Sequence, residues 1–167
     1  RLEHELSLAS QIQASFFPEA LPQFPGLELA AYWQPAREMG GDFYTTLELD
    51  DGRLVLVVAD VSGKGAPAAM AGALAVGLLE AYAPGQPEPE TLLAKLNQDL
   101  HARFIANYIN VACCYAILDI ASLALTVANA GCVYPYLRRG NELREIDVVG
   151  LPLGMWPDYT YLSQSLT

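Results

Sequence analysis

The sequence is poor in the side chains on which thiol and imidazole chemistry depends. Its 167 residues include two histidines, His4 and His101, and three cysteines, none of them in a C-x-x-C pair. A zinc site of clustered Cys and His ligands, and a nucleophile activated by a histidine base, are therefore nearly excluded. An odd number of cysteines in an apolar context is typical of reduced, buried thiols, so we expect a cytoplasmic protein.

Basic residues and long apolar runs are also scarce. Nine Lys and Arg oppose 19 Asp and Glu, which gives a net charge of −10. Nucleic acids and anionic lipid surfaces bind to basic surfaces, so we expect neither as a partner. The longest apolar run, Ala66–Leu79, is rich in Ala and Gly and too short to span a bilayer, so we expect no membrane insertion.

The residues that are present predict one folded domain preceded by a helix. Hydrophobic residues make up 53% and charged residues 17% of the chain, which allows a sizeable core. Apolar residues recur at spacings of three and four through residues 1–17, which predicts a connector helix that ends at Pro18. Two interpretations stay open: this helix packs on residues 18–167, or it pairs with a second copy as a coiled coil and dimerises the protein.

The rest of the chain shows the patterns of strands and of two helices. We expect strands at 27–33, 42–49 and 54–59, helices at 67–83 and 91–104, and strands at 111–118, 123–128, 134–138, 143–146 and 159–166. Short turns between strands favour antiparallel pairing, so we expect an α+β fold, a mostly antiparallel β-sandwich flanked by helices. The continuous apolar run Val55–Val58 predicts a central strand that is buried on both faces.

Two aspartates each lie at a glycine-flanked strand end. Asp42 follows two glycines, Asp60 ends an apolar strand, and Asp51-Gly52 between them is a strong hairpin signal that brings the two carboxylates together. Two carboxylates without a thiol or imidazole nearby indicate a hard divalent cation and metal-assisted phosphoryl chemistry. Alternatively, Asp42 caps a turn, and Asp60 forms an Asx turn or caps the following helix.

Two basic residues near these aspartates are candidates for binding phosphate. Lys64 stands between two glycines, but the G-x-x-x-x-G-K-[ST] spacing of a phosphate-binding loop is absent, so we expect this residue to be solvated. Arg37 is a candidate for bidentate contact with a substrate phosphate, although an exposed charge pair with Glu38 is the commoner arrangement.

Six segments in one order extend along nearly the whole chain. They are Ala9-x-x-Ile12-Gln13-x-x-Phe16-x-Pro18, Ala36-Arg37-Glu38-Met39-Gly40-Gly41-Asp42-Phe43-Tyr44, Val58-Ala59-Asp60-Val61-Ser62-Gly63-Lys64-Gly65-x-Pro67-Ala68-Ala69, Leu96-Asn97, Asn129-Ala130-Gly131 and Pro152-Leu153-Gly154. Together they resemble the metal-dependent protein Ser/Thr phosphatases of the type 2C class, in their bacterial SpoIIE/RsbU-like branch.

The resemblance implies a β-sandwich flanked by helices, with a site for two Mn²⁺ or Mg²⁺ ions at one end. Asp42 and Asp60 fall on the metal-binding aspartates of the family, with Asp60 bridging the ions and the Val61 carbonyl as a further ligand. The activity implied is hydrolysis of phosphoserine or phosphothreonine by a metal-activated water. The implied substrate is a phosphorylated regulatory protein of the anti-sigma-antagonist type, and the helix of residues 1–17 would connect a sensor domain to the phosphatase.

The sequence also departs from the family. Members continue into segments with further acidic ligands, which are absent before Thr167, so we expect residues 18–167 to be a phosphatase domain without its last segment. Three residues differ from the usual family residue: Thr45 stands in place of an acid, Asn110 in place of Thr, and Cys132 in place of His. These departures keep open a second hypothesis, a non-catalytic regulatory or dimerising module with an incomplete metal site, and they predict weak or no activity for the chain as given.

Overall fold

The computed structural model describes residues 1–35 and 37–167. Ala36, which belongs to one of the segments quoted above, lies outside the described residues. The elements in chain order are α1 (Leu2–Ala14), β1 (Phe43–Glu48), β2 (Arg53–Val61), α2 (Ala66–Tyr82), α3 (Pro89–Phe104), a 3₁₀ turn η1 (Ile105–Asn107), β3 (Val111–Asp119), β4 (Leu125–Ala130), β5 (Tyr136–Arg139), β6 (Glu142–Glu145) and β7 (Ser163–Leu166).

The strands form a five-stranded sheet in the order β1-β2-β3-β4-β7 and a two-stranded sheet of β5 and β6. Every neighbouring pair is antiparallel, and the α+β class predicted from the sequence is confirmed. The turn between β1 and β2 depends on Gly52, whose φ of 83° is a conformation that other residues adopt only with strain. The hairpin predicted from Asp51-Gly52 is therefore present, and it joins the two strands that lead to Asp42 and Asp60.

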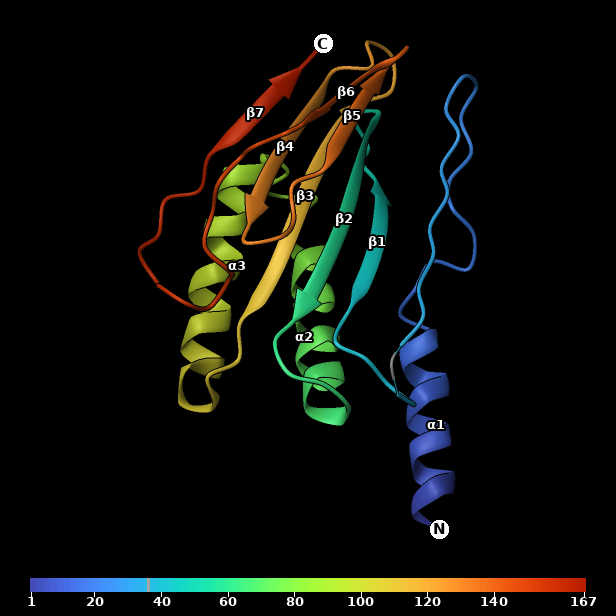
Figure 1. Ribbon diagram of the computed structural model, residues 1–167, viewed down its shortest axis with the longest axis vertical. Helices are drawn as coiled ribbons and strands as arrows, with labels where there is room; N and C mark the ends of the chain where they lie inside the picture. The colour runs from blue at the N-terminus through green and yellow to red at the C-terminus, as the bar shows by residue number, and fades with distance from the viewer. Residues whose placement is uncertain (36) are drawn as a thin grey trace.

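Helices α2 and α3 cover one face of the five-stranded sheet (Figure 1). Alternate residues of β2 and β3 point toward these helices, because successive side chains of a strand point to opposite faces. Helix α2 contributes mostly small side chains, which permits its close approach to the sheet. The main core cluster on this side includes Val55, Val57, Val61, Leu79, Leu92, Leu93, Leu96 and Tyr115.

Described segments cover the opposite face of the sheet only in part. Near β4 and β7, residues from the chain after β6 pack on the sheet and form the second layer of the expected sandwich, in a cluster of Val127, Ile146, Val148 and Leu166. Toward β1 and β2 this face is open. Val58 is 59% exposed, so the prediction that Val55–Val58 is buried on both faces is wrong at this residue.

The strand predicted at residues 27–33 is not formed. Leu27 makes one isolated bridge to Phe24, and the rest of the segment has no strand assignment. The segment runs over the open face of the sheet, where Leu29 and Ala31 line a hollow together with Tyr44 of β1. Its alternating apolar residues therefore reflect contact with the sheet through side chains, without the backbone pairing that defines a strand.

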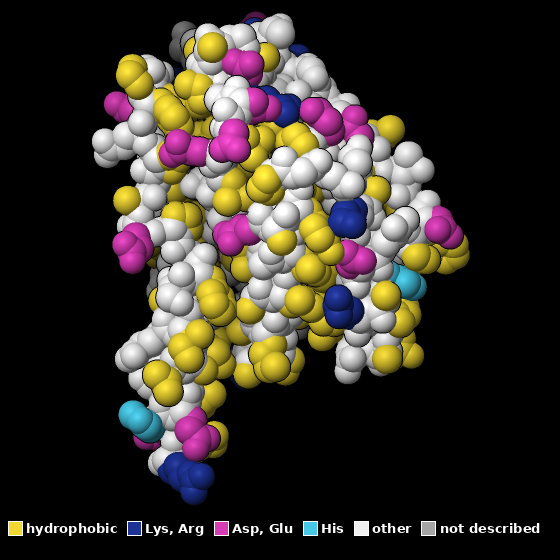
Figure 2. All heavy atoms as spheres, turned by 180° about the vertical axis from the view of Figure 1, so that it is seen from behind, with side chains coloured by type: hydrophobic (Ala, Val, Ile, Leu, Met, Phe, Trp, Pro, Cys, Tyr) yellow, Lys and Arg dark blue, Asp and Glu magenta, His cyan; other side chains and the backbone are white. Residues whose placement is uncertain are grey.

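Helix α1 protrudes from the body (Figures 1 and 2). Of its residues, all of which the structure describes, only Gln13 is buried, whereas Leu2, Leu8 and Ile12 are more than half exposed. The apolar pattern of residues 1–17 therefore gives a helix that leaves most of its apolar surface uncovered.

In the described ranges 1–35 and 37–167, the helices are all too short or too polar to cross a membrane.

Candidate functional site

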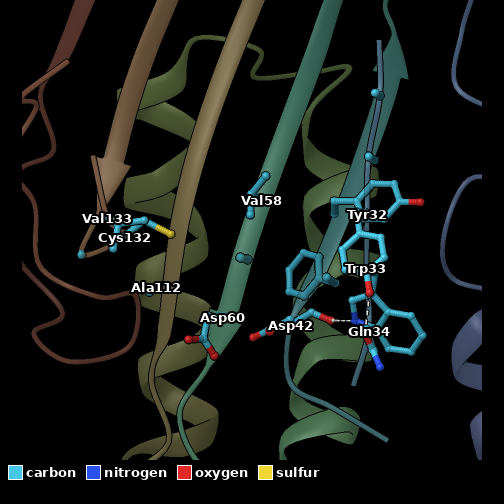
Figure 3. A pocket seen from close by; sticks show the side chains of 15 residues that line it. Tyr32, Trp33, Gln34, Asp42, Val58, Asp60, Ala112, Cys132 and Val133 are labelled. Atoms are coloured by element: carbon cyan, nitrogen blue, oxygen red, sulfur yellow. Dashed lines mark hydrogen bonds between the residues drawn. The ribbon is translucent and has the colours of Figure 1, made fainter. Parts of the chain in front are cut away.

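The two aspartates singled out in the sequence face each other across the β1–β2 hairpin. Phe43 pairs with Ala59, so the next residues outward, Asp42 and Asp60, stand opposite one another. Figure 3 shows both side chains at the same end of the two strands. The N-cap of helix α2 is Gly65, so the alternative in which Asp60 caps that helix is wrong.

The environment of Asp60 favours a bound cation. Although the Asp60 side chain is exposed overall, desolvation of its carboxyl group by neighbouring atoms raises the pKa, and hydrogen bonding and negative charge from Asp42 raise it further. Two facing carboxylates repel each other when both are ionised, so either one of them keeps a proton or a cation lies between them. At neutral pH a divalent cation can serve this purpose, and it binds to two ionised oxygen ligands.

The backbone beside the two aspartates is packed too closely for any residue but glycine at position 41. A Cβ atom on Gly41 would lie 2.8 Å from the Val61 carbonyl oxygen and 3.1 Å from the Ala68 Cβ. The Val61 amide donates to the Gly41 carbonyl at 3.4 Å. Asp42, Asp60 and the Val61 carbonyl, the three ligands that the resemblance implies, therefore lie at one end of one hairpin.

The donor atoms of Asp42, Asp60 and the Val61 carbonyl are all oxygens, which suits Mg²⁺ or Mn²⁺ better than zinc or copper. The set is small, however. Within residues 1–35 and 37–167, no group of three or more His, Cys, Asp or Glu side chains is arranged to hold a metal ion. The side chains described thus fit a divalent cation as two carboxylates with a neighbouring carbonyl, without a third acidic side chain.

A hollow of about 670 Å³ opens beside the carboxylates. Its walls are residues 30–34 on one side and 131–133 on the other, and its floor includes Val58 and Ala112. No lining residue from the described part of the chain carries a positive charge. Arg37 is exposed and does not line the hollow, so its contact with a substrate phosphate stays a prediction.

The three departures from the family pattern have different surroundings. Buried Thr45 points to the helix side of the sheet and donates a hydrogen bond to Glu80 at 3.0 Å. Asn110 pairs through its backbone with Ser62, donating to the hydroxyl at 3.0 Å and accepting from the amide at 2.9 Å. Cys132 is the one of the three that lines the hollow (Figure 3), where burial and the charge of Asp60 raise the pKa of its thiol.

The turn that places Cys132 is held by a buried amide. The Asn129 side chain accepts from the Cys132 amide at 2.8 Å and donates to the Cys132 carbonyl at 3.0 Å. Between them Gly131 has a φ of 75°, the left-handed conformation that suits glycine. The Asn-Ala-Gly segment thus ends β4 and begins the turn to residues 131–133, which form one wall of the hollow.

Helix α1 reaches the site through Gln13, a residue for which the sequence alone predicted no role. The Gln13 side chain donates to the Gly40 carbonyl at 2.5 Å and accepts from the Gly40 amide at 3.2 Å. Gly40 lies two residues before Asp42, so this helix holds the backbone that leads into the first carboxylate. The sequence signal was the place of Gln13 in the first of the six segments that resemble the family, where it is a polar residue within an amphipathic helix.

Comparison with known proteins identifies the family. The model of the family described as Stage II sporulation protein E (SpoIIE) matches residues 50–167, which is most of the chain. This chain belongs to the SpoIIE family. The predicted resemblance to the type 2C class and to its SpoIIE/RsbU-like branch is thereby confirmed.

Relatives of this SpoIIE-family chain agree with the match. "Phosphoserine phosphatase RsbU" of Bacillus subtilis (strain 168) is 26% identical over 162 residues, covering 96% of this chain and 48% of RsbU. The chain therefore spans about half the length of that curated relative. The SiaA-PP2C domain of Pseudomonas aeruginosa has the same fold, with a TM-score of 0.79 and 24% identity over 99% of this chain and 68% of that one.

A further solved structure is that of RsbX in complex with magnesium. It aligns with a TM-score of 0.62 and 21% identity, covering 79% of this chain and 62% of that chain. At these identities the solved structures show the fold of the SpoIIE-family chain. The mostly antiparallel α+β architecture described above is thus shared with type 2C phosphatase domains.

Proposed function

We propose that this SpoIIE-family chain catalyses metal-dependent hydrolysis of phosphoserine or phosphothreonine on a regulatory protein. The observation that carries the proposal is the pair Asp42 and Asp60, facing each other at the end of a hairpin beside an open hollow. The name of RsbU as a phosphoserine phosphatase supports the reaction type, and the magnesium in RsbX supports a divalent ion.

Asp42, Asp60 and the Val61 carbonyl are the residues that would hold the metal, which we propose to be two Mn²⁺ or Mg²⁺ ions. When bound, the ions supply positive charge for the phosphate and activate water for attack on phosphorus. The two carboxylates must be ionised to bind them, and because the pKa of Asp60 is raised, a metal competes with a proton at this carboxyl more than at an ordinary aspartate.

The hollow favours a polypeptide substrate over a small phosphorylated metabolite. Its volume of about 670 Å³ exceeds that of a phosphate group, and it is open to the surface along the sheet. Val58, Ala112 and Val133 give it apolar contact area, while the lining residues described provide no cation for a multiply charged small molecule. A side chain next to a phosphoserine therefore finds apolar surface, and the phosphate itself depends on the metal.

The uncovered helix α1 supports the proposal of a protein partner at the N-terminal side. Leu2, Leu8 and Ile12 expose more than half of their surface. We propose that this helix connects the phosphatase to a sensor domain and pairs with its counterpart in a homodimer. Sedimentation velocity should show a dimer that the Ile12→Glu variant loses; a monomer in both samples contradicts the proposed pairing.

A second candidate is a non-catalytic regulatory module of the same fold in the cytoplasm. The observation in its favour is that the described residues contain no third acidic side chain at the site. Such a protein would keep the fold and bind its phosphorylated partner without turnover.

The test is Mn²⁺-dependent hydrolysis of a phosphoserine peptide by the chain, measured beside Asp42→Asn and Asp60→Asn. Glu48→Gln, which removes the same charge from the exposed far end of β1, is the matched control. We expect weak turnover in the unmodified chain and in the control, in line with the departures from the family pattern, and its loss in both aspartate variants. Undiminished turnover in both variants refutes the assignment. Mn²⁺ binding without turnover in the unmodified chain favours the non-catalytic module.

A further inference from the structure

A fully buried asparagine on helix α3 holds a loop far away in the sequence. Asn97 has no exposed surface. Its side chain accepts from the Gly154 amide at 2.8 Å and donates to the carbonyls of Trp156 at 2.7 Å and Pro157 at 3.3 Å. The amide group thus makes all of its hydrogen bonds with backbone atoms of one loop. The adjacent ring of His101 contacts the Gly154 carbonyl at 2.8 Å and adds a second tie.

This loop pairs with the first residue of β3 and so extends the sheet next to the candidate site. Leu153 and Val111 exchange two backbone hydrogen bonds of 2.8 and 2.9 Å at the start of β3. On its other side Val111 pairs with Val61, and the next residue of β3, Ala112, pairs with Asp60. A continuous path of backbone pairing therefore runs from the loop held by Asn97 to Asp60 and Val61.

The same loop supports the opposite wall of the hollow. A Cβ atom on Gly131 would lie 2.5 Å from a ring carbon of Pro152, and one on Gly150 would overlap the carbonyl oxygen of Asn129. This packing leaves no space for the loop to shift independently of the end of β4. Gly131 and the neighbouring Cys132 line the hollow together with Asp60.

We propose that Asn97 is a positioning residue for the metal centre. By holding the loop at residues 153–157, it fixes the position of the start of β3 beside Asp60 and Val61. Through the same loop it fixes the wall of the hollow at residues 131–133. The proposal rests on the proposed function insofar as the centre binds a metal. Asn97 does not touch the hollow itself, so its effect passes through the loop.

Three variants of the full chain test this. Asn97→Ala removes all three hydrogen bonds, and Asn97→Asp keeps the shape and the acceptor for the Gly154 amide but loses both donors. Tyr115→Phe is the matched control. It removes one hydrogen bond of 3.1 Å from a fully buried side chain to the Pro87 carbonyl, at a point of β3 remote from Asp60. If neither Asn97 variant folds, His101→Ala, which removes only the second tie to the Gly154 carbonyl, takes their place.

Two measurements are made on each variant. Mn²⁺ affinity is measured by electron paramagnetic resonance, and amide hydrogen exchange is measured on the metal-free protein. We expect both Asn97 variants to bind Mn²⁺ about tenfold more weakly, the size of effect seen when groups that orient metal ligands are removed. We expect faster exchange at residues 58–63 and 131–133. Tyr115→Phe should leave both quantities at their original values.

The outcomes separate this inference from the proposed function. Equal Mn²⁺ affinity and equal exchange at those segments in all variants overturns the positioning role and leaves Asn97 as a stabilising residue. If the unmodified chain does not bind Mn²⁺, the metal-dependent function fails, and hydrogen exchange alone decides. In that case, faster exchange confined to residues 151–157 overturns the inference, whereas its spread to 58–63 and 131–133 supports it.

Discussion

Replacing Asp60 with Asn is expected to stabilise the metal-free protein and to abolish its response to Mn²⁺. The reason is the facing position of Asp42 and Asp60 on neighbouring strands. Like charges directly opposite one another destabilise a sheet. Cross-strand Cβ atoms lie about 5 Å apart, and two unit charges at about 5 Å in water repel by about 0.8 kcal/mol. Because both side chains are exposed, solvent screens the charges, and the repulsion stays close to this value for water.

The assay is thermal unfolding with a chelator and with Mn²⁺. For a chain of this size, about 1 kcal/mol corresponds to a rise of roughly 2–4 °C in melting temperature. With Mn²⁺ at about 100 times its Kd, the unmodified chain should gain about 2.7 kcal/mol, and the variant should gain little. Glu48→Gln controls for the change in net charge. A lower metal-free melting temperature in Asp60→Asn than in the control refutes the reasoning about repulsion.

The pH dependence of the metal-free protein gives a second check with a definite sign. The pKa of Asp60 is raised in the folded state above 3.8, the ordinary value for an aspartate, so the folded protein binds this proton more tightly than the unfolded chain. The contribution of this bound proton to the free energy of unfolding is therefore complete below pH 3.8 and is lost as pH rises through the raised pKa. Asp60→Asn should lack this loss, so the stability difference between variant and parent should grow with pH across that window.

Three further predictions concern the surroundings of the site. Gln13→Ala removes both hydrogen bonds to Gly40, and we expect a loss of about 1–3 kcal/mol in urea unfolding with faster proteolysis of α1; an unchanged cleavage rate would contradict this. Gly41→Ala places a methyl group 2.8 Å from the Val61 oxygen and should cost about 1–3 kcal/mol by the same assay, whereas no loss would show that the backbone yields. The Cys113 thiol is fully buried with a pKa raised well above 9.0, so iodoacetamide should label it only after unfolding, as mass spectrometry can show.

The hairpin half of the site could be predicted because its signals are local. Asp51-Gly52 specifies a tight turn, and such a turn fixes the register of the strands on either side. In that register Phe43 pairs with Ala59, which places Asp42 opposite Asp60. The apolar patterns of α2 and α3 likewise predicted helices that cover one face of the sheet. Each of these inferences needed residues no more than a few positions apart.

The remaining features depend on contacts between distant parts of the chain. Residues 27–33 have the composition of a strand, but pairing requires a neighbouring backbone edge, and the sequence of the segment does not reveal whether one is present. Val58 has the composition of a core residue, yet whether a strand is covered on both faces depends on what packs above it. Gln13 and Asn97 act through hydrogen bonds to backbone atoms 27 and 57 residues away, and such bonds leave no periodic pattern.

The loop held by Asn97 has a consequence for the order of folding. The β1–β2 hairpin closes locally, on the microsecond timescale of such motifs, and places Asp42 opposite Asp60 by itself. The contact between Asn97 and Gly154 spans 57 residues, and contacts of long sequence separation are slow to form. We therefore expect the carboxylate pair to be assembled before the loop docks. Substitutions at Asn97 should then accelerate unfolding and leave the folding rate almost unchanged.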